Sequence, residues 1–123
     1  MGKFTLRRVP SGVRFDLRAS NGEVIASSEV YRTLAACRAG AQSVRRCAAA
    51  ANVEDLTAGD GGQIANPKFQ LFQDRAGQFR FRLKARNGQV IAASEGYRTK
   101  AGALSGMESV RANAPGAALD WAD

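Results

Sequence analysis

One motif of chemically versatile side chains occurs twice in the chain. The pattern Ser-Glu-x-Tyr-Arg-Thr fills residues 28–33 and again residues 94–99. A hydroxyl, a carboxylate, a phenol and a guanidinium at the start of a helix could form a pocket for an anion or a small ligand. The same residues also have structural uses, because Thr can cap the helix, Tyr can pack under the turn and Glu can pair with Arg or a backbone N–H. The candidate ligand residues are Ser28, Glu29, Tyr31, Arg32, Ser94, Glu95, Tyr97 and Arg98.

A second candidate site is a row of basic residues in the second half of the chain. Residues 80–86, RFRLKAR, alternate basic with apolar side chains, so in a strand every basic side chain points to the face opposite the core. Residues 14–20, RFDLRAS, are a weaker version of this row. An open sheet face with basic and aromatic side chains can hold single-stranded nucleic acid by neutralising phosphates and stacking on bases. Alternatively, the long basic side chains only solvate the face and discourage edge-to-edge association. The candidate nucleic-acid or partner-binding residues are Arg80, Arg82, Lys84, Arg86, Arg14, Arg18 and Phe72.

The composition excludes several classes of catalyst. The 123 residues include no His, which removes Ser-His and Cys-His nucleophile pairs, imidazole bases and most catalytic zinc sites. Glu29 and Glu95 hold matching positions, but their spacing does not tell whether the two carboxylates converge, as acid/base catalysis would require. The sequence GDGG at residues 59–62 lacks the alternating oxygen ligands of a calcium loop, and no Walker or dinucleotide motif occurs. We therefore expect a protein that is not an enzyme and that has no catalytic residue, no metal and no cofactor.

Charge and cysteine content bound the partners and the compartment. Lys and Arg outnumber Asp and Glu by 18 to 11, a net charge of +7 that is shared by both halves rather than collected in a basic tail. Cys37 and Cys47 fall in one predicted helix, roughly 15 Å apart, which is too far for a disulfide. The N-terminus has no apolar signal region and the chain has no long apolar run, so we expect a cytoplasmic protein without a membrane contact.

An internal duplication sets the organisation of the chain. The 35 residues that begin at Arg14 match those that begin at Arg80 at a constant offset of 66, with 20 identities. We place the first repeat at residues 1–56, a Gly-rich linker at residues 57–67 and the second repeat at residues 68–123.

Each repeat begins with three predicted strands. Two runs of alternating apolar and polar residues predict half-buried strands in each copy. Asn21-Gly22 and Asn87-Gly88 then predict two-residue type I′ hairpin turns that lead into a third strand.

A helix and a short strand complete each predicted repeat. Thr33 and Thr99 precede Ala-rich segments with apolar residues three or four apart, which predicts amphipathic helices with a Thr N-cap. Gly40 and Gly106 lie on the apolar stripes, and we interpret them as letting each helix approach the sheet closely. Residues 53–56 and 118–121 predict a last strand, so each repeat is β-β-β-α-β.

The size of the repeat favours one shared core. A unit of about 55 residues buries too little surface to be comfortably stable alone. We expect an α+β fold in which both repeats share one antiparallel sheet, with both helices on one face, the other face open to water, and pseudo-twofold symmetry in one compact domain. Because the duplicated chain satisfies its own symmetry, we expect a monomer.

The segment RFRLKARNGQVIAASEGYRTK, residues 80–100, followed by GMESVRANAP, resembles the repeat signature of the YegP-like family of small proteins of unknown function. The resemblance covers nearly the whole chain. It implies that the halves exchange their last strands, with residues 53–56 pairing into the second half and residues 118–121 into the first. It implies no activity, cofactor or catalytic residue. The first copy departs from the signature at Asp16, Val30 and Leu34, so a ligand site that uses those positions would exist once.

Three functions are compatible with these patterns. The first is a non-enzymatic module that binds another macromolecule, foremost a protein. The second is binding of single-stranded DNA or RNA on the basic sheet face. The third is a small-molecule or enzymatic site at the duplicated Ser-Glu-x-Tyr-Arg-Thr motif.

Overall fold

The computed structural model describes residues 2–57 and 64–121. In this part of the chain each half runs β-β-β-α-β, as the sequence predicts. The first half consists of β1 (Lys3–Val9), β2 (Gly12–Arg18), β3 (Val24–Ser27), α1 (Leu34–Cys47) and β4 (Asn52–Asp55). The second half consists of β5 (Lys68–Gln73), β6 (Phe79–Lys84), β7 (Val90–Ala93), α2 (Lys100–Asn113) and β8 (Ala118–Trp121). Among these helices, neither combines the length with the apolar character that crossing a membrane requires. The predicted linker, residues 57–67, falls largely on residues 58–63, which lie outside the described ranges.

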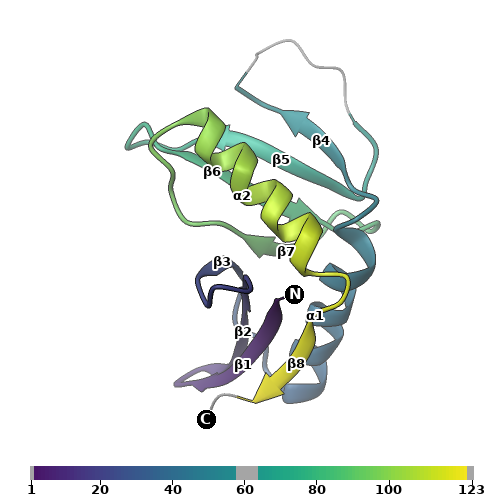
Figure 1. Ribbon diagram of the computed structural model, residues 1–123. Coiled ribbons are helices and arrows are strands. Elements are labelled where there is room, and N and C mark those ends of the chain that lie inside the picture. Colours follow the sequence, from purple (N-terminus) through teal and green to yellow (C-terminus); the bar gives the residue numbers. More distant parts are fainter. Residues whose placement is uncertain (1, 58–63, 122–123) are drawn as a thin grey trace.

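The described strands form one eight-stranded sheet in the order β4-β5-β6-β7-β3-β2-β1-β8. The predicted exchange of last strands is confirmed, because β4 of the first half pairs with β5 and β8 of the second half pairs with β1 (Figure 1). The inner six strands are antiparallel as predicted, but the two outer pairings are parallel. Hairpin turns enforce antiparallel pairing within each half, whereas each outer strand follows a helix and has no turn that fixes its direction.

The two central strands of the sheet, where the halves meet, share the shortest stretch of residue pairing. Strands β3 and β7 pair through a single residue pair, Ser27 with Ala93. The helices bridge this junction, because α1 packs on β1 and β2 of its own half and on β7 of the other, while α2 packs on β5, β6 and β3. Buried residues of both halves form one apolar cluster whose largest members are Phe4, Phe15, Phe69 and Phe81. The halves therefore share one core.

The prediction of type I′ hairpin turns is wrong. Such a turn needs positive φ at both central residues, but in the described chain Gly22 (φ 88°) and Gly88 (φ 85°) have positive φ and no non-glycine residue does. Each glycine N–H donates to the carbonyl three residues earlier at 2.9 Å, so the glycine follows the turn in a three-residue loop. Asn21 and Asn87 instead stabilise the loop through Oδ1, which accepts an N–H two residues later at 3.0 Å. The longer loop also takes Arg86 out of strand β6.

Gly40 and Gly106 make room for a tyrosine rather than for the sheet backbone. A methyl group added at Gly40 would collide with the Tyr31 hydroxyl oxygen, and one added at Gly106 would collide with the Tyr97 hydroxyl oxygen. The helix therefore approaches the sheet with a phenol tip between them, and the repeated Tyr and the repeated Gly form one packing unit.

An arginine of α2 closes the end of α1. The guanidinium of Arg111 lies 5.1 Å from the ring centroid of Phe69, and its Nε donates to Glu108 Oε2 at 3.2 Å. Its terminal nitrogens donate to the backbone oxygens that follow α1, those of Ala48 and Ala49 at 3.1 Å and of Ala51 at 2.6 Å. Carbonyls at a helix end lack partners within the helix, so one side chain of the second half satisfies the helix end of the first.

We expect Arg111→Ala to lower the free energy of unfolding by about 1.5–3 kcal/mol, because carbonyls bonded to a charged donor lose that donor. Arg45 is the matched control, since it occupies the same position in α1 without a side-chain bond to any described residue. Arg45→Ala should change the free energy by no more than about 0.5 kcal/mol. Urea denaturation of both variants measures the difference, and equal effects would show that Arg111 does not close α1.

Candidate functional site

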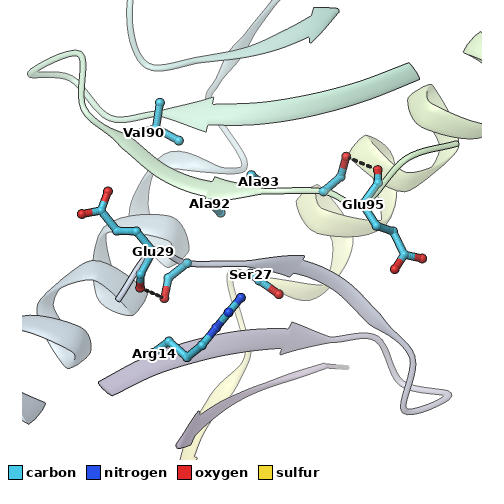
Figure 2. Close-up of a pocket in the computed structure, with 9 residues that line it drawn as sticks. Arg14, Ser27, Glu29, Val90, Ala92, Ala93 and Glu95 are labelled. Carbon is cyan, nitrogen blue, oxygen red and sulfur yellow. Dashed lines mark hydrogen bonds between the residues drawn. The ribbon is translucent and has the colours of Figure 1, made fainter. Parts of the chain in front are cut away.

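The two copies of the Ser-Glu-x-Tyr-Arg-Thr motif meet at a groove between β3 and β7. The groove has a volume of about 410 Å³ and is drawn in Figure 2. It lies beside the single residue pair that joins the halves, where the two strands diverge. The lining residues are Arg14, Ser27, Ser28, Glu29, Val90, Ala92, Ala93, Ser94 and Glu95.

The motif serines are committed to the backbone. Ser28 Oγ accepts the N–H of Phe15 at 3.0 Å and donates to the carbonyl of Glu29 at 2.7 Å. Ser94 makes the same two bonds, with the N–H of Phe81 at 3.0 Å and with the next carbonyl at 2.8 Å. Both hydroxyls tie the segment before a helix to a core strand, and neither is paired with a base.

The motif tyrosines and threonines also shape the fold. Each Tyr ring stacks on a core Phe, with centroids 6.4 Å apart for Tyr31 and 6.3 Å apart for Tyr97. Burial raises the pKa of both phenols, and the neighbouring carboxylates raise it further. The predicted N-caps are confirmed, because Thr33 Oγ1 accepts an N–H of the first turn at 3.1 Å and Thr99 Oγ1 does so at 2.9 Å.

The two motif glutamates do not converge. Glu29 and Glu95 are both exposed, and their carboxylates point away from each other at opposite ends of the groove (Figure 2). Arg32 and Arg98 are exposed as well, and neither bonds a side chain in the described part of the protein. These two motif glutamates are therefore not placed to share an acid/base reaction.

Arg14 is the one charged group that projects into the groove between the glutamates (Figure 2). Its Nε is buried and has no hydrogen-bond partner among the described residues. Its Nη2 lies 4.0 Å from Asp16 Oδ1, at the limit of an ion pair. The groove therefore presents one guanidinium together with serine hydroxyls that are already hydrogen-bonded. This arrangement is better suited to a weak contact with an anion than to a catalysed reaction.

On the sheet face opposite the helices, one row of paired residues crosses all eight strands. In strand order it consists of Glu54, Gln70, Arg82, Ala93, Ser27, Asp16, Thr5 and Asp120. Pseudo-symmetry relates the first four members to the last four. Arg82 thus occupies the position that Asp16 occupies in the other half, and the duplicated sheet carries opposite charges at equivalent places.

Most of this row is hydrogen-bonded to its neighbours. Glu54 accepts from Gln70 Nε2 at 2.6 Å and from Lys68 Nζ at 3.1 Å. Gln70 Oε1 in turn accepts from Arg82 Nε at 2.7 Å. At the other end, Asp16 accepts from Ser27 Oγ at 2.7 Å and from Arg7 Nε at 3.1 Å. The open face therefore carries two hydrogen-bonded polar clusters, one around Glu54, Gln70 and Arg82 and one around Asp16, and several of its cations are already paired.

The predicted basic row is only partly realised. Arg80, Arg82 and Lys84 lie in β6 and share the open face, but Arg86 lies in the following loop, because the hairpin loop is longer than predicted. Arg80 Nε pairs with Asp74 Oδ2 at 2.7 Å. Lys84 bonds no side chain among the described residues.

The aromatic candidate on the open face, Phe72, is covered by an arginine of the same protein. Phe72 lies on the open face, with the guanidinium carbon of Arg82 4.7 Å from its ring centroid. In the first half, Arg18 Nη1 donates to the carbonyl of Gly22 at 2.9 Å. A base that stacked on this side of the Phe72 ring would have to displace Arg82.

The sequence matches a known protein family over most of its length. The profile of the family described as "Domain of unknown function (DUF1508)" matches residues 11–55 and 74–120, one segment in each repeat. This chain belongs to the DUF1508 family. A UPF0339 protein of Pseudomonas aeruginosa is 35% identical over 118 residues, which cover 95% of this chain and 94% of that protein. The YegP-like resemblance is confirmed, since the solution structure of the protein of unknown function YegP of E. coli superposes with a TM-score of 0.78 at 29% identity, covering 98% of this chain and 91% of that one.

Some relatives have about the length of one repeat. A UPF0339 protein of Treponema denticola is 62% identical over 52 residues, which are 42% of this chain but 90% of that protein. A single DUF1508 unit thus occurs as most of a chain in this relative, whereas the present chain joins two.

The polar residues that lie beside the basic row on the open face were not predicted from the sequence. Glu54, Gln70 and Lys68 were not among the candidate residues, although all three are buried on the open face. Alternation within β5 places residues 68 and 70 on that face, but Glu54 reaches them only because β4 is exchanged into the second half.

Within the described residues of this DUF1508 chain, no three His, Cys, Asp or Glu side chains gather as a metal site. Cys37 and Cys47 are free and buried.

The network on the open face predicts acid sensitivity. Bonds from Gln70, Ile64 and Lys68 lower the pKa of Glu54 from 4.5 to about 2. A carboxyl whose pKa is lower in the folded state stabilises the fold above its unfolded pKa, and this stability is lost as the pH falls. We expect the free energy of unfolding to decrease from about pH 4.5 towards pH 2, and the decrease to be smaller in Glu54→Gln.

Urea titrations monitored by circular dichroism at several pH values measure this slope. The matched control is Glu95→Gln, which removes an exposed carboxylate outside the network and should keep the wild-type slope. A Glu54→Gln slope equal to that of the wild type would show that the network does not stabilise the fold through Glu54.

Proposed function

We propose that this chain is a non-enzymatic, cytoplasmic and monomeric module that binds another protein, and that its contact strand is β8. The observation that carries the proposal is the outer edge of the sheet at β8. No described strand pairs with the outer side of β8, and Trp121 on this strand is 42% exposed. Unpaired strand edges add an extended segment of a partner through backbone hydrogen bonds, and large aromatic side chains anchor such contacts.

The surroundings of Trp121 support a specific contact. The guanidinium carbon of Arg8 lies 5.5 Å from the ring centroid of Trp121, which orients the ring and leaves the rest of it open. Lys3 pairs with Asp120 at 3.8 Å, so one charged pair marks the same edge. Exposed aromatic residues beside an open edge are costly unless something covers them, because such edges promote unspecific pairing.

The geometry of the Ser-Glu-x-Tyr-Arg-Thr motif supports a non-enzymatic role. The motif serines bond the backbone, and the motif glutamates point to opposite ends of the groove (Figure 2). Neither arrangement brings a nucleophile to a base or an acid to its partner.

Single-stranded nucleic acid on the open sheet face is the second candidate. It is favoured by the basic residues of β2 and β6 that share this face with Phe72. It is disfavoured because Arg80 and Arg82 bond Asp74 and Gln70, and because Arg82 covers the Phe72 ring. A bound phosphate would compete with acceptors already at hydrogen-bonding distance.

Affinity capture, with this chain as bait in an extract of the organism that makes it, tests the proposal. We expect one protein to be retained by the wild type and lost with Trp121→Ala, since the aromatic anchor is removed. Val30→Ala is the matched control, because Val30 is 40% exposed but lies outside the sheet edges, and it should retain the protein. Capture that is insensitive to Trp121→Ala would contradict the proposal.

Oligonucleotide binding at several salt concentrations tests the second candidate. Recognition of nucleic acid would appear as oligothymidine binding that weakens steeply with salt and is abolished by Arg82→Glu or Lys84→Glu. We expect that no such binding is observed. Such binding would replace protein recognition by nucleic-acid recognition as the function.

A further inference from the structure

Helix α1 carries three arginines whose positive charge is not compensated by an acidic residue of the same helix. Its sequence, LAACRAGAQSVRRC, includes Arg38, Arg45 and Arg46 and no acidic residue. At 3.6 residues per turn these three arginines span roughly 100° of the helix circumference, away from the buried stripe. None of them forms an ion pair or a side-chain hydrogen bond with a described residue, in contrast to Arg7, Arg80, Arg82 and Arg111.

A groove runs beside this basic surface. It has a volume of about 520 Å³ and lies between the end of α1 and the loop that joins β6 to β7. Arg46 of the first half and Arg86 of the second half both line it, and Ala50, Pro67 and Ala85 provide apolar contacts. Because the two arginines come from different repeats, the groove exists only when the halves are assembled.

The other half of the molecule shows that the fold does not require this charge. At the offset of 66, Arg38 corresponds to Leu104, Arg46 to Ala112 and Arg86 to Ser20. Both halves build the same helix and the same hairpin loop. The second copy builds its helix without equivalents of Arg38 and Arg46, and the first copy builds its hairpin loop without an equivalent of Arg86, so neither element needs these charges in order to fold.

We propose that this groove binds an acidic polypeptide segment, with carboxylates on Arg46 and Arg86 and a small apolar side chain between them. The apolar lining matches a peptide side chain and gives nothing to a phosphate backbone. No aromatic ring lines the groove, so it lacks the stacking platform that single-stranded nucleic acid uses. The inference goes beyond the proposed function, because it concerns a second surface, distant in sequence from β8.

Binding of a defined acidic peptide tests the inference. The probe is a fluorescein-labelled peptide of about 12 residues with alternating Glu and Ala, added to the full chain at about 50 mM salt while anisotropy is recorded. We expect Arg46→Glu and Arg86→Glu each to weaken binding by about tenfold or more, because each replaces attraction by repulsion. Arg75→Glu is the matched control, since Arg75 is exposed, has no described partner and lies at the opposite end of β6. It should weaken binding by less than about twofold.

A second variant separates the groove from charge alone. Ala50→Leu fills the apolar lining without altering charge, and we expect it to weaken the peptide as well. The inference is overturned if the peptide does not bind, if Arg75→Glu weakens it as much as Arg46→Glu, or if Ala50→Leu has no effect. It is also overturned if an oligothymidine of equal length binds more tightly with the same dependence on Arg46 and Arg86. Each of these results leaves capture through Trp121 unaffected, so the two proposals fail separately.

Discussion

The exchange of the outer strands holds this molecule together. Each half ends in a strand that is hydrogen-bonded to the first strand of the other half, β4 to β5 and β8 to β1. The direct junction in the middle of the sheet is a single residue pair, and it would not by itself hold two repeats in register. The exchanged strands, the helices that cover both sides of the junction and Arg111 at the end of α1 provide the remaining connections. Separating the halves would expose two incomplete sheets and divide one apolar core.

This constraint explains which features of the repeat are duplicated and which are not. Both copies keep the serine bonded to a core strand, the threonine cap and the tyrosine that fits a helical glycine. These contacts position each helix on the shared sheet, so both halves need them. The charged surface has diverged, because Arg82 corresponds to Asp16 in the other repeat and Arg46 corresponds to Ala112. The surfaces that occur once are therefore the places where recognition is to be sought, and the duplicated motif is chiefly a device of the fold.

Much of the fold could be predicted from the sequence, because it rests on local patterns. The alternation in β5 and β6, the Thr caps and the offset of 66 were sufficient for the elements and their order. The features that failed depend on geometry that the pattern does not carry. Asn87-Gly88 is compatible with two loop lengths, and the choice of the longer one removed Arg86 from its strand. Gly106 signalled a close approach, but the Tyr97 hydroxyl that fills the space comes from outside the helix. Gln70, the acceptor of Arg82, lies in the neighbouring strand of the same half, but its partner Glu54 comes beside it only through the exchanged strand β4.

Native-state hydrogen exchange at two equivalent amides tests most directly whether the halves form one body. The amides of Phe15 and Phe81 each donate to a buried serine oxygen at 3.0 Å, one in each half. Leu71 is fully buried in β5, and Leu71→Ala should cost about 2–5 kcal/mol. If the exchanged strands make one cooperative unit, the free energy of exchange falls by the same amount at both amides. A decrease at Phe81 with no change at Phe15 would show two independently stable halves and would contradict the account.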